Sequence, residues 1–446
     1  MENAIRNRTS NKLVLMLIDA WRSEFLFGSH ENNHMPFLNR LRLFDHVSSY
    51  NAHLQPPTVT MPRIKAITAG IIPSFVDVLL NFASDSMNDD NIIDRLWKSG
   101  RRLMFCGDDT WLKLFPGRFL DRSEGIVSFY VNDYIEVGLL ISSPSISLIF
   151  RTSLFSNDWT AFSDLQVDNN VTLCLKKELT NETISTWDVM ILHYLGLDHI
   201  GHSLGGESNI LHKKLKEMDG IIENIYDTLV RVHNSNFSML IFGDHGMTEA
   251  GNHGGSSEKE VNVPLIYIDG QRIQGARSIL FSAIYSIEQI DIVPTLASIF
   301  NFEIPVKSLG ITFVDQLVPR KRKKDYLMPL VSLLKNSYQI TGLLDVANAH
   351  LNNCIEDCIK NLEGFCHKRN LSQISLASNI ASCKKSLHSV QEKLMTKEAA
   401  FKSFSYIFLG ICISIMVSCI SIWLLFSTVA IAQTVAKTHN EPFMNG

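Results

Sequence analysis

The stretch that decides the fold is Ser238–Gly255, SMLIFGDHGMTEAGNHGG. Its apolar run, Met239–Phe242, is typical of a buried strand and ends one glycine before Asp244 and His245. A second glycine-rich turn carries His253. Ligands of α/β proteins bind outside the carboxyl ends of the strands, and carboxylate and imidazole groups both bind zinc-like ions. The stretch therefore predicts a metal site at a sheet edge. The alternative is a polar turn whose Asp and His only cap each other.

Two further apolar runs end in the same kind of side chain. Lys12–Ala20, KLVLMLIDA, is typical of a central parallel strand and carries Asp19 at its carboxyl end. Val189–Leu195 indicates a second buried strand, and Asp198 and His202 follow it. Because these two residues are four apart, one face of a helical turn can direct both side chains at a single ion. We therefore add all three side chains to the candidate ligands.

Other polar residues beside these strands have weaker patterns. His193 lies inside the second strand and His199 lies just after it, and we interpret both as groups that support the site rather than as ligands. Asp108 and Asp109 follow the short apolar run Leu103–Cys106. They are placed to line the same edge, but no spacing requires it.

A candidate nucleophile comes from Gln55–Gly70, QPPTVTMPRIKAITAG. The two prolines favour an extended chain, and the residues from Ile64 onward have helical character. A hydroxyl at the start of such a helix can attack phosphorus, because the helix dipole and the free backbone N–H groups favour a phosphate there. The candidates are Thr60 and, as the fallback, Thr58. The alternative interpretation of each is a simple helix cap.

The order of strands and helices indicates the fold class. Further elements are a strand at Val261–Ile268 and helices at Leu211–Leu229 and Ile287–Phe300. This alternation predicts a doubly wound α/β domain with a mostly parallel sheet over residues 12–316. Strand ends far apart in the sequence meet at one edge of such a sheet, so we expect the candidates to gather there. Two divalent ions roughly 3.5–4 Å apart would then activate the threonine hydroxyl and hold the phosphoryl oxygens. Zinc is the ion that mixed Asp and His ligands favour.

The remaining segments differ from this pattern. Gly138–Gln166 is Ser-rich and apolar without clear periodicity, and we expect it to be an insertion, either a surface loop or an aberrant exon. Residues 317–404 are expected to form a linker and a helical region. Tyr406–Ala432 runs for 27 residues without a charge. That length is enough to cross a bilayer, and it predicts one C-terminal transmembrane helix.

Composition argues against some functions. The 446-residue chain has a net charge of -4, so it lacks the basic character of a nucleic-acid-binding protein. None of its eight cysteines belongs to a CxxC pair, which argues against a cysteine zinc site. The four from Cys354 to Cys383 can pair in an oxidising compartment. N-glycosylation sequons matter only on a lumenal or extracellular domain, and they occur at Asn7, Asn170, Asn181, Asn236 and Asn370.

Four stretches, KLVLMLIDA, PPTVTMPRIKAITAG, LHYLGLDHIGH and FGDHGMTEAGNHGG, resemble the alkaline phosphatase superfamily. Within it, the chain is similar to the GPI ethanolamine phosphate transferases over residues 12–310. The resemblance implies an alkaline-phosphatase type of sheet and Thr60 as the nucleophile. It also implies two zinc ions, one held by Asp198, His202 and His253 and the other by Asp19, Asp244 and His245 with the Thr60 oxygen nearby.

The resemblance further implies an activity, a location and partners. Phosphoethanolamine would pass from phosphatidylethanolamine to the threonine, and then to the 6-hydroxyl of the second mannose of a GPI precursor. This would occur at the endoplasmic reticulum membrane with the catalytic domain in the lumen, together with a small membrane partner subunit. The family pattern includes an N-terminal membrane anchor and many C-terminal membrane helices, so we expect this chain to be truncated or mis-spliced. The alternatives are a phosphodiesterase of the nucleotide pyrophosphatase type, with water as acceptor, and a catalytically silent membrane scaffold.

Overall fold

The computed structural model describes residues 12–28, 34–73, 86–126, 159–233, 236–273, 284–318, 322–344, 348–367 and 371–439. Within these ranges, the side chains at 159–166, 233, 401–413, 417 and 421–439 are outside the description. The chain forms two compact units, Met1–Glu392 and Lys393–Gly446. The first unit contains the sheet, and the predicted domain boundary at residue 316 stays a prediction.

An eight-stranded mixed sheet forms the centre of the first unit, in the order β4-β3-β5-β1-β6-β7-β2-β8. The central pairs β5-β1 and β1-β6 are parallel, whereas β7 runs antiparallel to both β6 and β2. The α/β class and the mostly parallel sheet are therefore confirmed, and the sheet is mixed because β7 runs against the other described strands. Antiparallel neighbours need no crossover helix, which suits the connection from β6 to β7. The strands are β1 Lys12–Ile18, β2 Val47–His53, β3 Leu103–Asp108, β4 Glu124–Ile126, β5 Val189–Tyr194, β6 Phe237–Gly243, β7 Asn262–Asp269 and β8 Tyr285–Glu288.

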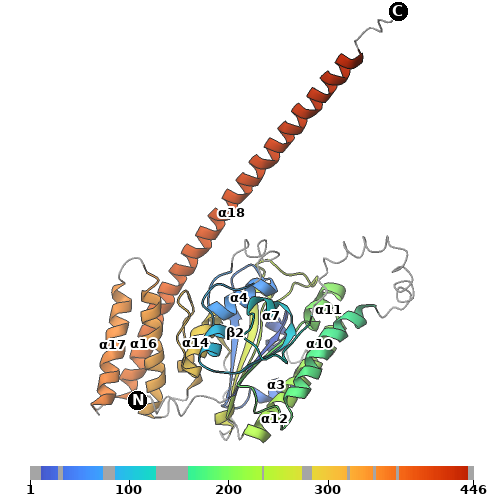
Figure 1. Ribbon diagram of the computed structural model, residues 1–446. Helices are drawn as coiled ribbons and strands as arrows, with labels where there is room; N and C mark the ends of the chain where they lie inside the picture. Colours follow the sequence, from blue (N-terminus) through green and yellow to red (C-terminus); the bar gives the residue numbers. More distant parts are fainter. Residues whose placement is uncertain are drawn as a thin grey trace, which may run out of the picture. The chain divides into compact units, whose positions relative to one another are not determined.

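Helices cover both faces of the sheet, which explains why its central strands are apolar throughout (Figure 1). Val14 and Met16 of β1 pack with α3, α10, α11 and α12, whereas Leu13 and Leu15 pack with α4, α6, α7 and α14. The helices of this unit before its C-terminal region are α2 Glu24–Phe27, α3 Pro36–Leu41, α4 Thr60–Ala69, α6 Ile92–Lys98, α7 Thr110–Leu114, α10 Trp159–Glu178, α11 Gly196–Leu204, α12 Asn209–His233, α13 Glu258–Val261, η2 Gly270–Arg272, η3 Gln289–Asp291, α14 Ile292–Phe300 and α15 Val314–Leu317.

Two predicted elements differ from the structure. The helix expected over Ile287–Phe300 begins only at Ile292, because Ile287 pairs with Ala52 as part of β8 and a 3₁₀ turn follows. Within the expected insertion, residues 159–166 form the first part of α10, so this part is helical rather than a loop. Residues 138–158 of that insertion lie outside the described residues.

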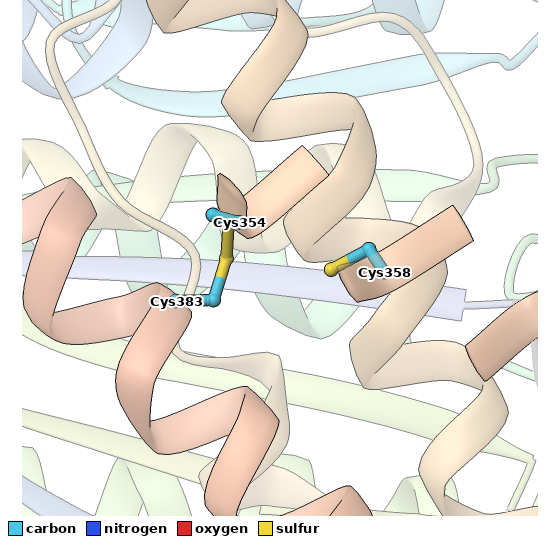
Figure 2. Close-up of side chains that lie close together, drawn as sticks. All are labelled: Cys354, Cys358 and Cys383. Carbon is cyan, nitrogen blue, oxygen red and sulfur yellow. A yellow bond between two sulfur atoms is a disulfide. The ribbon is translucent and has the colours of Figure 1, made fainter. Parts of the chain in front are cut away.

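Disulfides join elements that are distant in the sequence. Cys106 of β3 is bonded to Cys174 of α10, and Cys354 is bonded to Cys383. Figure 2 shows the sulfur of Cys358 pointing towards the second disulfide. These three sulfurs lie within 4.8 Å of one another, but two of them are already bonded and do not offer thiolates. The bond ties α17 (Ala349–Cys366) to α18 (Gln373–His439). Helix α17 packs on α16 (Leu327–Thr341), which follows η4 (Lys323–Tyr326).

The predicted membrane span falls in α18. Among the side chains that the structure describes, no helix combines the length and the apolar character needed to cross a bilayer. Most side chains of residues 406–432 lie outside that part of the chain. The transmembrane helix therefore stays a prediction.

Candidate metal centre

The structure gathers all the predicted site residues at the carboxyl edge of the central strands, in two groups. Each comes from the end of a strand, the first turns of a helix or a glycine-rich loop. The outer group consists of Asp198, His202 and His253, and the inner group consists of Asp19, Asp244, His245 and Thr60.

In the outer group, three side chains converge. His202 Nε2 lies 3.0 Å from His253 Nε2 and 3.4 Å from Asp198 Oδ2. His253 Nε2 lies 3.5 Å from Asp198 Oδ1. The Nδ1–H of His253 donates to the carbonyl oxygen of Thr58 at 2.8 Å, so in the neutral ring Nε2 carries the free lone pair. This is the tautomer that a metal ligand needs.

In the inner group, His245 Nε2 is the common neighbour. It lies 3.4 Å from Asp19 Oδ1, 3.4 Å from Asp244 Oδ2 and 3.4 Å from Thr60 Oγ. Its other nitrogen, Nδ1, donates to the carbonyl oxygen of Gly246 at 3.0 Å. Thr60 Oγ also approaches Asp19 Oδ2 at 3.3 Å. Three different segments of the chain, at the ends of β1 and β6 and at the start of α4, therefore direct ligand atoms at one point.

These separations match those around a zinc ion. Ligands bound at about 2.0–2.1 Å in a tetrahedral arrangement lie roughly 3.3 Å from one another. The measured separations run from 3.0 to 3.5 Å in the outer group and from 3.3 to 3.4 Å in the inner group. The rings of His245 and His253 stack with their centroids 4.1 Å apart, so the two groups are neighbours.

Unsatisfied carboxylate oxygens support the same conclusion. Asp19 Oδ1, Asp198 Oδ1 and Asp244 Oδ2 are buried and accept no hydrogen bond. A buried carboxylate oxygen without a partner is costly unless a cation is bound to it. The alternative of a polar turn whose Asp and His only cap each other leaves these three oxygens unexplained, whereas two metal ions would satisfy them.

Charge in the site also favours bound cations. Burial and the charges of Asp244 and Asp198 raise the pKa of Asp19 well above its usual range. Burial, together with the charge of His245, lowers the pKa of His253 to about 4. A neutral imidazole is the form that binds a metal, and a bound cation would favour the ionised form of each carboxylate.

The two groups differ in their access to solvent. The side chains of His202 and His253 are 22% and 14% exposed, whereas those of Asp244 and His245 are fully buried. A substrate therefore reaches the site from the side of the outer group.

Backbone geometry after β1 helps to build the inner group. Ala20 has φ +54°, a left-handed conformation that a non-glycine residue rarely adopts. In this conformation its N–H donates to Asp244 Oδ1 at 3.2 Å. The strained residue therefore joins the ends of β1 and β6, and such strain is frequent at functional sites.

The structure separates the two threonine candidates. The Thr58 hydroxyl donates to the carbonyl oxygen of Gly255 at 2.9 Å and accepts from the N–H of Gly254 at 2.7 Å. The Thr60 hydroxyl instead faces the inner group. Thr58 therefore holds the loop that carries His253, and Thr60 is the hydroxyl among the ligands.

Sequence reasoning missed two supporting residues. Glu260 accepts from the N–H groups of Gly255 and Ser257 at 2.7 and 3.1 Å and so fixes the loop around His253. Its signal was the capping box from Ser257 to Glu260. Gln289 donates to the carbonyl oxygens of Gly243 and Asp244, both at 2.8 Å, and no local sequence pattern indicated this.

Of the weaker candidates, His193 and Asp108 lie beside the metal centre rather than in either group. His193 is buried, and its Nε2 lies 3.2 Å from Asp19 Oδ2. Burial lowers the pKa of His193. Asp108 ends β3 and accepts from the N–H of Thr110 at 2.8 Å, and Asp109 pairs with Lys113 at 2.7 Å.

A hydroxyl at a helix start, beside two convergent Asp/His groups on an α/β sheet, defines the class of metal-dependent enzymes that act on phosphate esters. The family model described as type I phosphodiesterase / nucleotide pyrophosphatase matches residues 13–262. This is more than half of the chain, and the chain belongs to that family.

Several curated proteins named GPI ethanolamine phosphate transferase 2 are similar to the chain. The protein from Debaryomyces hansenii is 38% identical over 355 residues, which cover 76% of this chain and 36% of that protein. The Saccharomyces cerevisiae protein is 39% identical over 342 residues, which cover 71% of this chain and 37% of that protein. The human catalytic subunit of that name is 38% identical over 337 residues, covering 75% and 30%. The chain thus spans about a third of the length of these relatives.

Solved structures also align with the chain, at low sequence identity. A mutant of alkaline phosphatase PafA aligns with a TM-score of 0.49 at 10% identity, covering 69% of this chain and 99% of that one. The C-terminal periplasmic domain of phosphoethanolamine transferase EptC from Campylobacter jejuni aligns with a TM-score of 0.43 at 14% identity, covering 66% and 91%.

Proposed function

We propose that the chain transfers phosphoethanolamine from phosphatidylethanolamine to the second mannose of a GPI precursor. The observation that carries the proposal is the convergence of two groups of ligand atoms, at zinc-like separations, around the hydroxyl of Thr60. The relatives named GPI ethanolamine phosphate transferase 2 support the choice of donor and acceptor.

Two divalent ions, with zinc the best match to the ligands, would supply the positive charge that activates a hydroxyl and holds the phosphoryl oxygens. Asp198, His202 and His253 would hold one ion, and Asp19, Asp244 and His245 would hold the other with Thr60. The pairing of ligands to each ion follows the two groups in the structure.

The reaction has two displacements at phosphorus. Thr60 Oγ forms a bond to phosphorus while the bond from phosphorus to the diacylglycerol oxygen breaks, and diacylglycerol leaves with a proton. The mannose hydroxyl then attacks the same phosphorus, the bond to Thr60 Oγ breaks, and the threonine recovers its proton. Asp19 Oδ2, 3.3 Å from Thr60 Oγ, is placed to hold that proton.

Helix α4 supports binding of the phosphoryl group. Thr60 is its first residue, and Val59 provides no side-chain cap for the free N–H groups of the first turn. The helix dipole adds partial positive charge at this end. The hydroxyl and the anion-binding helix end therefore face the same phosphoryl group.

Location and partners belong to the same proposal. We place the enzyme at the endoplasmic reticulum membrane with its catalytic domain in the lumen, anchored by residues 406–432 and joined by a small membrane subunit. The relatives' names support GPI-precursor chemistry, and the sequons, such as the exposed Asn181, are compatible with a lumenal domain.

A second candidate is a phosphodiesterase of the nucleotide pyrophosphatase type, which the description of the matching family favours. It would use the same threonine and ions but release the phosphoryl group to water. A catalytically silent scaffold would retain the ions without either reaction.

The test uses the full-length chain in detergent with zinc, phosphatidylethanolamine labelled in its headgroup and a mannose-containing GPI precursor. We expect two zinc ions per chain and label on the glycolipid, with a transient adduct on Thr60. Asp244→Asn is expected to lose zinc and transfer together, because one ligand charge disappears. Free phosphoethanolamine or nucleotide cleavage as the main product would favour the phosphodiesterase. Two zinc ions without turnover on either substrate would favour the scaffold.

A further inference from the structure

A buried histidine connects the metal centre to the sheet behind it. His193 lies near the end of β5, pairs with Leu17 of β1 and is fully buried. One ring nitrogen, Nε2, lies 3.2 Å from Asp19 Oδ2. The other, Nδ1, lies 3.2 Å from the indole Nε1 of Trp111 in α7. The ring therefore bridges an aromatic residue of the core and a ligand of the inner group.

The indole determines which nitrogen of His193 carries the proton. A tryptophan N–H only donates, so Nδ1 must accept and has no proton. In the neutral ring the proton is on Nε2, which points at Asp19 Oδ2. The histidine is therefore held as a hydrogen-bond donor towards the carboxylate.

We propose that His193 is a positioning residue, which holds Asp19 so that Oδ1 faces the inner ion. His193 Nε2 and the Thr60 hydroxyl both contact Oδ2, at 3.2 and 3.3 Å, whereas Oδ1 accepts no hydrogen bond and lies 3.4 Å from His245 Nε2. Without the histidine donor, the longer contact from the Thr60 hydroxyl remains on Oδ2, and this hydroxyl is itself the group that reacts. The Asp19 carboxylate then has more freedom to rotate about its side-chain bonds, and either oxygen can turn away from the ion. The inference rests on the proposed function only in that the inner group binds a metal ion.

The neighbouring strand leaves space for this arrangement. A Cβ atom added to Gly107 of β3 would lie 2.7 Å from Cβ and 2.9 Å from the carbonyl oxygen of His193. Only glycine lets β3 approach so closely without a shift. The next residue, Asp108, accepts from the N–H of Thr110 at 2.8 Å, at the start of the helix that carries Trp111. Gly107 thus makes room for the β5 backbone at His193, and Asp108 holds the start of the helix that carries Trp111, the donor to the His193 ring.

Two substitutions at His193 separate the two hydrogen bonds. The side-chain nitrogen of His193→Gln reaches the position of Nε2, so this variant keeps a donor for Asp19 and loses the acceptor for Trp111. The side chain of His193→Asn reaches only the position of Nδ1, so it keeps the acceptor and loses the donor. Each leaves one buried partner unsatisfied, so we expect similar unfolding midpoints for the pair.

The readout is metal binding by the full-length chain in detergent, measured by competition with a chromophoric chelator and by the absorption spectrum of the Co²⁺-loaded protein. We expect His193→Asn to weaken one of the two sites by roughly 10–100-fold and to change the Co²⁺ spectrum. His193→Gln should stay within about threefold of the wild type, since outer partners act through their hydrogen bond. Trp111→Phe keeps an aromatic ring but removes the donor to Nδ1, so either nitrogen of His193 can then carry the proton. The metal affinity of this variant should lie between those of His193→Asn and His193→Gln.

Each other outcome has a definite meaning. Wild-type affinity at both sites of His193→Asn would overturn the inference and leave the proposed function intact. Equal losses in His193→Asn and His193→Gln would show a purely structural role and would also overturn it. If neither His193 variant folds, an unchanged Co²⁺ spectrum in Trp111→Phe would overturn the inference. A wild-type chain that binds no zinc would overturn the proposed function and this inference together.

Discussion

Thr58 and Thr60 lie two residues apart but have different roles in the structure. One pair of substitutions can distinguish these roles. The perturbation is Thr→Val at each position, which removes the hydroxyl and keeps the branched shape. Thr60 contacts the inner group, whereas Thr58 contacts the loop that carries His253 and Glu260, the residue that fixes this loop.

The cost in stability follows from the hydrogen bonds that each hydroxyl makes. Thr58→Val removes the bond to Gly255 at 2.9 Å and leaves the N–H of Gly254 without its acceptor at 2.7 Å. Losing these two partly buried bonds should lower the free energy of unfolding by about 1–3 kcal/mol. The contacts of Thr60 are longer, 3.3 and 3.4 Å, so Thr60→Val should change it by less than about 1 kcal/mol.

The effects on chemistry should have the opposite order. Thr60→Val removes the nucleophile, so transfer should fall on the order of 10⁴-fold or more, with no covalent adduct. Thr58→Val moves the His253 loop but keeps every ligand, so we expect a loss of roughly 10–100-fold and a normal adduct. Intact-mass spectrometry after incubation with phosphatidylethanolamine reports the adduct, and urea unfolding of the same preparations reports stability. An adduct on Thr60→Val combined with none on Thr58→Val would refute the reasoning and make Thr58 the nucleophile.

Three further predictions test other parts of the molecule. Burial raises the pKa of Glu288 from its ordinary 4.5 to about 7, so its contribution to stability is present below pH 4.5 and lost as the pH rises to 7. Between pH 4.5 and pH 7, the free energy of unfolding measured in urea should fall by up to about 3 kcal/mol less in Glu288→Gln than in the wild type. An equal fall in the variant and the wild type would contradict the assignment. Asn181 is exposed in the turns before β5, so a lumenal domain should carry a glycan there that Asn181→Gln removes on an endoglycosidase gel; an unchanged mobility would argue against a lumenal domain. Cys383→Ser opens a link across 29 residues and should lower the free energy of unfolding by up to about 3–4 kcal/mol. Cys366→Ser, at an exposed free thiol, should leave it unchanged, and equal effects would exclude the disulfide as the cause.

The local sequence was sufficient to predict a strand and its site residue where a buried apolar run and a polar ligand residue stand next to each other in one stretch. The strands expected over Lys12–Ala20, Val189–Leu195 and Met239–Phe242 are confirmed as β1, β5 and β6. A continuous apolar run is stable only when both faces of a strand are covered, and a polar residue directly after it must then lie at the sheet edge. The same reasoning predicts that Asp19 and Asp244 lie at one site, although they are far apart in the sequence.

Other features depend on contacts between distant segments. The direction of β7 is decided by its pairing with β6 and β2, and the strand character of Ile287 by its pairing with Ala52. No residue near either position encodes its partner, because apolar strands of either direction have the same local pattern.

By itself, the sequence determined the α/β class, the three central strands and the residue types at their ends, because hydrophobic periodicity and side-chain chemistry are local properties. Only the tertiary structure shows that the Thr60 hydroxyl contacts the ligands while the Thr58 hydroxyl contacts the His253 loop, and that His193 donates to Asp19. Those outcomes depend on separations of a few tenths of an ångström between groups from different strands. Packing of the whole sheet sets such distances, and no single stretch of the chain contains them.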